Sequence, residues 1–159
     1  MLTLEIFIHT DAVDRTTWHG AADDRPLTEL GQRQAERLAS ELAGAPLQAI
    51  YSSQALRCRA SLEPLSKLTG LPVHVLPAFQ DTADKALGAL HEIHAAVPDG
   101  RAVLCSYGDV VPALLTLLAT QWGEPAPARE TRKGAIFTLR YDGAGGSIDM
   151  RAPGRDFPG

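Results

Sequence analysis

Long apolar runs are missing from this sequence. Glu5 interrupts the first strand-like run and no basic segment precedes it, so we expect neither a signal peptide nor a transmembrane helix. Cysteine is also scarce: the chain has Cys58 and Cys105, which lie far apart and form no CxxC motif. A domain of this size does not depend on disulfides, so the expected location is the reducing cytoplasm.

An excess of positive charge is missing too. The chain has 15 Lys and Arg residues against 19 Asp and Glu residues, a net charge of −4 and a pI near 5.7. This balance lacks the broad basic surface typical of proteins that bind nucleic acids or anionic membranes, so we expect neither partner. Apolar material is ample, since 45% of the 159 residues are hydrophobic. That is enough to bury the core of one globular domain.

Short β-forming runs alternate with helical segments along the chain. The run from Leu2 to His9 is rich in β-formers, and the next segment places Leu30, Gln34, Leu38 and Leu42 on one helical stripe. Further strands are predicted at 48–53, 73–76 and 101–106, further helices at 54–69, 82–97 and 109–122, and a hairpin at 134–150.

This alternation predicts a three-layer α/β/α sandwich around a mostly parallel sheet. The domain is expected to span residues 1–150. Residues 151–159 form a Pro/Gly-rich tail that need not be ordered.

Polar side chains follow the predicted parallel strands, where such sheets bind their ligands. The loops concerned are 9–24, 52–54, 77–81 and 106–109. An imidazole, guanidinium groups and helix N-termini suit a phosphate or another oxyanion, and a carboxyl group can protonate a leaving oxygen. The candidate side chains are His9, Arg15, Arg25, Arg57, Asp81 and Tyr107.

Two stretches carry a resemblance to a known family. They are "RPLTELGQRQAERLASEL", from Arg25, and "IYSSQALRCRASLEPLSKLTG", from Ile50. Together they closely resemble the histidine phosphatase superfamily, whose members commonly read RPLTxxGxxQAxxLAxxL followed by SSPxxRC and a helix with EPL. The resemblance runs from the first strand to about Asp142. It is closest to the compact bacterial, phosphohistidine-phosphatase-like branch of this phosphoglycerate mutase-like group.

The resemblance implies a fold, a reaction and roles for particular residues. Family members have the phosphoglycerate mutase-like sandwich and hydrolyse phosphomonoesters without a metal or other cofactor, through a phosphorylated histidine that an Arg-His pair supplies. Carried over by position, His9 is the nucleophile, Arg57 a phosphate ligand and Asp81 the candidate proton donor. The implied partner is a small phosphorylated metabolite or a phosphoprotein.

This sequence departs from the family pattern at two phosphate ligands. Counting back from "RPL" without a gap puts His9 on the nucleophile and Ile8 on the preceding arginine. A shift by one residue would instead put Thr10 on the nucleophile. In the fourth strand, Tyr107 stands where the family has its second histidine.

Other cations could restore the lost charge. They are Arg15, His19 and Arg25 in the first loop, with Arg132 and Lys133 as further residues that could attract an anion. Three functions therefore stay open: a phosphatase of weak or altered activity, a pseudophosphatase that only binds a phosphorylated ligand, or a different biosynthetic activity with His9 and Tyr107 as base and acid. His91 and His94 lie three residues apart on a helix, but no Cys, Asp or Glu cluster completes a metal site around them.

Overall fold

The computed structural model describes residues 1–80, 82–128, 130 and 132–159. Strands and helices alternate as the sequence predicts. The strands are β1 (Leu2–Ile8), β2 (Ala49–Ser52), β3 (Val73–Val75), β4 (Gly100–Ser106), β5 (Ile136–Tyr141) and β6 (Gly146–Arg151). The helices are α1 (Glu29–Leu42), α2 (Leu56–Thr69), α3 (Ala83–Ala96) and α4 (Val110–Trp122).

The strands form one sheet in the order β3-β2-β4-β1-β5-β6. The pairs β3–β2, β2–β4 and β4–β1 are parallel, whereas β5 pairs antiparallel with β1 and β6 antiparallel with β5. The predicted α/β sandwich is therefore confirmed, with an antiparallel hairpin on one side of its parallel strands. The hairpin matters for the site, because β5 begins where β1 ends.

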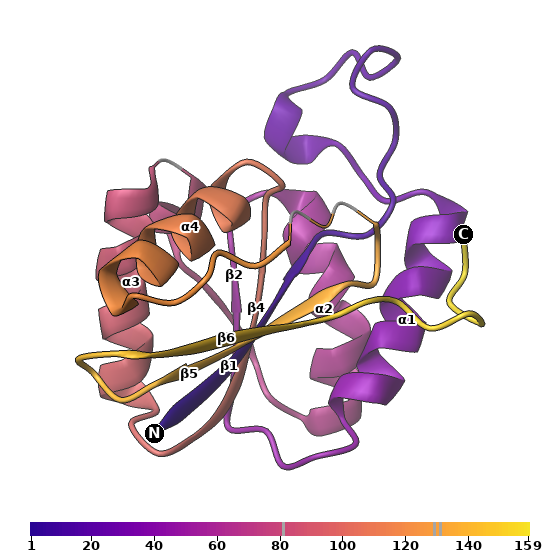
Figure 1. Ribbon diagram of the computed structural model, residues 1–159. Coiled ribbons are helices and arrows are strands. Elements are labelled where there is room, and N and C mark those ends of the chain that lie inside the picture. The colour runs from indigo at the N-terminus through magenta and orange to yellow at the C-terminus, as the bar shows by residue number, and fades with distance from the viewer. Residues whose placement is uncertain (81, 129, 131) are drawn as a thin grey trace.

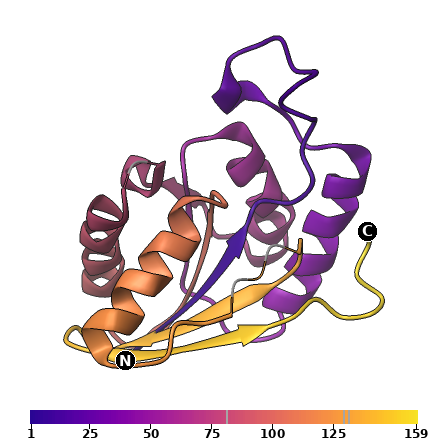
Figure 2. The ribbon, with the colours of Figure 1, turned by 45° about the horizontal axis from the view of Figure 1, so that its top comes forward.

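Helices cover both faces of the sheet (Figure 2). One apolar core lies between the sheet and the α3–α4 layer, and the second lies between the sheet and the α1–α2 layer. The central strand β1 serves both: Leu4 and Ile6 belong to the first core and Phe7 to the second. A strand buried on both faces reads as a nearly continuous apolar run, which explains its composition. No helix in the described part of the chain is long and apolar enough to cross a membrane.

A polar pair interrupts the β1 run without leaving the interior. Glu5 is buried, and Arg101 on the neighbouring strand β4 donates from Nε to Glu5 Oε2 over 2.6 Å. Arg101 also donates to the carbonyl oxygen of Ala45 over 3.0 Å. A buried carboxylate is tolerated when a cation and hydrogen bonds compensate the loss of water, and Arg101 provides both.

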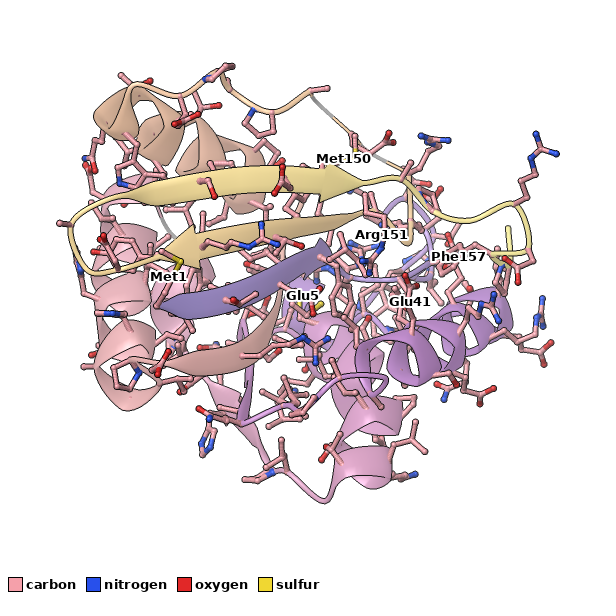
Figure 3. All side chains as sticks on the ribbon, turned by 60° about the horizontal axis from the view of Figure 1, so that its bottom comes forward. Met1, Glu5, Glu41, Met150, Arg151 and Phe157 are labelled. Atoms are coloured by element: carbon pink, nitrogen blue, oxygen red, sulfur yellow. The ribbon has the colours of Figure 1, made fainter. Side chains whose placement is uncertain are left out.

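The C-terminal tail, which the composition leaves free to be disordered, is held against the domain. β6 ends in Arg151, which pairs with Glu41 of α1 over 2.9 Å (Figure 3). Beyond it, Phe157 packs on the second core, and Gln34 Nε2 donates to the carbonyl oxygen of Pro158 over 2.9 Å. The chain therefore ends beside α1 (Figure 1).

Candidate active site

A cavity of about 750 Å³ opens at the carboxyl ends of β1 and β4. It is lined by five of the six candidate side chains that the sequence analysis names. Asp81, the candidate proton donor, lies outside the described residues. His19 is exposed and does not line the cavity. The predicted residues that line it are His9, Arg15, Arg25, Arg57 and Tyr107.

The loop from β1 to α1 forms one side of the cavity and projects from the body of the domain (Figure 1). Its base is closed by hydrogen bonds from Val13 N to Pro26 O (2.9 Å) and from Thr28 N to Asp11 O (3.1 Å). The Asp11 carbonyl approaches α1 so closely that a Cβ at Gly31 would lie 1.9 Å from its oxygen. The glycine in the "RPLTELG" motif therefore allows the loop to seat on the helix.

Two arginines of this loop differ in burial: Arg25 is held at the base of the loop, whereas Arg15 is exposed. Arg25 is buried and donates to the carbonyl oxygen of Val13 over 2.7 Å. Burial, followed by the charges of Arg57 and Arg15, lowers the pKa of Arg25. The charges of Arg57 and Arg15 contribute to this shift because these guanidinium groups lie near Arg25.

His9 lies directly after β1 and lines the cavity. Its Nδ1 is 2.8 Å from the carbonyl oxygen of Thr10. A carbonyl can only accept, so Nδ1 carries the hydrogen and Nε2 of the neutral ring has a free lone pair. Burial lowers the pKa of His9 to about 3; the charges of Lys133, Arg57 and Arg25 act in the same direction, and the bond to Thr10 opposes them. His9 is therefore a neutral imidazole at physiological pH.

The neighbouring Thr10 does not reach the cavity. It is fully buried, and its backbone N–H donates to Ser61 Oγ of α2 over 3.0 Å. Of these two neighbouring residues, His9 lines the cavity and Thr10 does not.

Arg57 and Tyr107 pack against each other in the cavity. The guanidinium carbon of Arg57 lies 4.7 Å from the centre of the Tyr107 ring, and one of its NH₂ groups donates to Ala22 O over 3.0 Å. Arg57 Nε is buried and has no hydrogen-bond partner among the described residues. The Tyr107 hydroxyl donates to Asp23 Oδ1 over 3.4 Å, and burial raises the pKa of Tyr107, so the phenol stays protonated.

Lys133 also lines the cavity, although from the sequence it is only a charge that could attract an anion. Parallel sheets bind their ligands at the carboxyl ends of their strands, where the sequence places the site. Lys133 instead precedes β5, which runs antiparallel and therefore contributes its amino end to the same edge. Recognising the late hairpin as a neighbour of β1 would have found it.

Three carboxylates share the cavity with these cations: Asp11, Asp23 and Asp109. Asp11 Oδ2 accepts a hydrogen bond from the Thr28 hydroxyl over 2.6 Å, and Asp23 accepts from Tyr107. In the parts of the chain that are described, no group of three or more His, Cys, Asp or Glu side chains is placed to hold a metal ion.

Two serines near the ends of β2 and β4 do not line the cavity. Ser53 and Ser106 are fully buried, with their hydroxyl oxygens 2.5 Å apart, and Ser106 donates to Phe79 O over 3.0 Å. These bonds tie the ends of β2 and β4 to the turn after β3. Both hydroxyls therefore support the site without facing a ligand.

Comparison with known proteins adds a family and a fold to this geometry. The model of the histidine phosphatase superfamily (branch 1) matches residues 9–83. An 8-oxo-(d)GTP phosphatase of Mycolicibacterium smegmatis is 29% identical over 144 residues, which cover 86% of this chain and 44% of that protein. This chain thus spans less than half the length of that relative.

Solved structures of low sequence identity share the fold. The protein histidine phosphatase SixA, solved with tungstate, superposes with a TM-score of 0.74 at 22% identity, covering 95% of this chain and 97% of that one. A mycobacterial glucosyl-3-phosphoglycerate phosphatase gives a TM-score of 0.75 at 17% identity, covering 96% and 99%.

Proposed function

Because the chain belongs to the histidine phosphatase superfamily, we propose that it hydrolyses phosphomonoesters, with weak or altered activity, through a phosphohistidine at His9. The observation that carries this proposal is the state of His9: a neutral imidazole whose Nδ1 is held by Thr10, in a cavity lined by cations. A nucleophilic nitrogen beside groups that attract an oxyanion is the arrangement that phosphoryl transfer to an imidazole needs.

In the proposed reaction, His9 Nε2 attacks the phosphorus atom and the bond from phosphorus to the ester oxygen breaks. The leaving oxygen takes a proton, for which Asp81 is the sequence-based candidate. Water then attacks the phosphohistidine, releasing inorganic phosphate and restoring the neutral ring. Arg57 is the proposed ligand of the phosphoryl oxygens, assisted by Arg15 and Arg25, with Tyr107 as a neutral donor.

The expectation of weak activity comes from Ile8 and Tyr107, which replace two cationic phosphate ligands of the family pattern. Hydrogen bonds to charged groups contribute roughly 1.5–3 kcal/mol each, so losing two costs about 3–6 kcal/mol, on the order of 10²- to 10⁴-fold in rate. The same replacements favour a second candidate, a pseudophosphatase that binds a phosphorylated metabolite or phosphoprotein without turnover.

A phosphoenzyme assay tests the proposal. The protein is incubated with a panel of phosphomonoesters, and turnover and acid-labile phosphate on the protein are measured for the wild type, His9→Ala and His19→Ala. His19 is the matched control because it lies on the same loop, exposed and outside the cavity lining. We expect the wild type and His19→Ala to form the phosphoenzyme and His9→Ala to lose it.

Two results would contradict the proposal. Turnover that survives in His9→Ala would rule out His9 as the nucleophile. An absence of turnover, combined with phosphate-ester binding that Arg57→Met abolishes, would favour the pseudophosphatase.

A further inference from the structure

The sheet topology places Lys133 at the same edge as His9. β5 pairs antiparallel with β1, with Phe137 opposite Ile6, so the residues just before β5 lie beside the end of β1. Lys133 occupies this position and lines the cavity with His9. At the end of β1 itself, the residue before His9 is the neutral Ile8, which lines the same cavity.

Lys133 is only partly withdrawn from water. The residue is half-buried, and within the described residues it makes no hydrogen bond or ion pair. Burial lowers the pKa of Lys133, and the charge of Arg25 acts in the same direction. The negative charge of Asp11 opposes both, but the pKa is still lowered. A cation held in this way loses hydration that an anionic ligand would replace.

The turn that carries Lys133 packs against the C-terminal tail. Gly134 adopts a φ of +92°, which a residue with a side chain would adopt only under strain, and Ala135 N donates to Arg132 O over 3.3 Å. A Cβ at position 134 would also lie 2.7 Å from the ring of Phe157, so the tail packs directly on the turn.

Gln34 connects this tail to the loop that follows His9. Its side chain donates to Pro158 O over 2.9 Å and accepts from Asp11 N over 2.8 Å. The Lys133 turn, the C-terminal tail and the first loop therefore support one another. Their mutual contacts fix the backbone at Lys133 relative to the cavity, as a binding residue requires.

We infer that Lys133 is a phosphate ligand of this site, contributing from the amino end of β5 a positive charge that Ile8 and Tyr107 do not provide. The inference rests on the proposed function for the identity of the ligand, a phosphoryl group. Its ammonium group would donate to a phosphoryl oxygen while His9 Nε2 faces phosphorus. The cation thus reaches the site from a strand outside the parallel part of the sheet.

Equilibrium binding of inorganic phosphate tests this assignment independently of turnover. We would measure the Kd by titration calorimetry at pH 7 for the wild type, Lys133→Met, Lys133→Arg and the control Lys67→Met, whose lysine is exposed on α2 and pairs with Glu63. We expect Lys133→Met to weaken binding about 10- to 100-fold, Lys133→Arg to retain most of it, and Lys67→Met to have no effect. Equal affinity of Lys133→Met and the wild type would overturn the inference.

A protection experiment on the unmodified protein guards against a variant that fails to fold. Lys67, Lys85 and Lys133 are the lysines of the chain, and their amine labelling can be followed by mass spectrometry with and without phosphate. We expect phosphate to slow the labelling of Lys133 selectively; equal slowing at all three lysines, or none, would overturn the assignment.

The two experiments separate this inference from the proposed function. Loss of phosphate binding in Lys133→Met without any phosphoenzyme in the wild type would support the ligand and reject the phosphatase. A phosphoenzyme at His9, with phosphate binding indifferent to Lys133, would do the opposite.

Discussion

The two ends of the sheet each hold a histidine and a tyrosine, but the two groups are satisfied in different ways. At the end away from the cavity, Tyr141 donates to Gly143 O over 2.9 Å, so His91 Nδ1 must donate to the Tyr141 oxygen, also over 2.9 Å. The Trp122 ring stacks on the Tyr141 ring, with the two ring centroids 5.7 Å apart. The polar groups here are paired with each other.

At the cavity end, several polar groups have no such partners. Among the described residues, Arg57 Nε is buried without a hydrogen-bond partner, Lys133 makes no ion pair, and His9 Nε2 makes no hydrogen bond. Mutually paired polar groups stabilise a fold, whereas unpaired ones leave hydrogen-bonding capacity for a ligand. The same two residue types therefore contribute to stability at one end of the sheet and leave polar atoms available to a ligand at the other.

The largest expected effect comes from returning the missing charges to the cavity end. The double variant Ile8→Arg/Tyr107→His should raise kcat/KM for a phosphomonoester by about 10²- to 10⁴-fold, because each restored cation adds a charged hydrogen bond to the transition state. Steady-state kinetics measure the gain. The control is His9→Ala in the same background, which should remove it; a gain that persists without His9 would show that the chemistry does not pass through this histidine.

The next effect concerns pH and stability. The folded-state pKa of His9 is about 3, below its unfolded value of 6.5, so the unfolded chain binds the proton more readily. The contribution of neutral His9 to the free energy of unfolding is therefore complete above pH 6.5 and lost as the pH falls toward 3. At about 1.4 kcal/mol per pKa unit, the loss reaches about 5 kcal/mol.

Urea unfolding between pH 7 and pH 4 measures this dependence. We expect His9→Gln to flatten the fall in stability. A fall of the same steepness in His9→Gln would contradict the assignment of this pH dependence to His9. Bound phosphate should raise the pKa of His9, because an anion opposes the neighbouring cations.

A smaller effect is expected when the unpaired arginine is removed. Arg57→Met should weaken phosphate binding about 10- to 100-fold while leaving stability nearly unchanged, because it removes one hydrogen bond and a buried N–H donor that has no partner in the described part of the chain. Calorimetric titration and thermal unfolding measure the two quantities. Arg37→Met, an exposed arginine paired with Asp156, serves as the control. Equal phosphate affinity in both variants would show that Arg57 is structural.

The smallest effect belongs to the end away from the cavity. Tyr141→Phe removes the hydroxyl that links Gly143 and His91, so we expect a loss of about 1 kcal/mol in the free energy of unfolding. Phosphate affinity should not change. A change in affinity would mean that the two ends are coupled through β5, and the contrast between them would be weaker than the contacts indicate.

Particular residues show how far the sequence predicts this structure. The stripe of Leu30, Gln34, Leu38 and Leu42 correctly predicts α1, but it does not explain why a glutamine lies on it. In the structure Gln34 is buried and connects Asp11 with Pro158, two segments far apart in the chain. The same contacts order the tail, which composition alone leaves open.

The sequence by itself determined the alternation of strands and helices, the family motifs and the positions of His9 and Tyr107 directly after two strands, because periodicity and motif spacing are local properties of the chain. The tertiary structure decided that His9 rather than Thr10 faces the cavity and that Lys133 lies beside it. The first depends on the packing of Thr10 against Ser61 of α2, and the second depends on which strands become neighbours. An antiparallel β5 next to β1 reverses the end of the strand that reaches the site, and pairing between distant segments leaves no signature in local sequence.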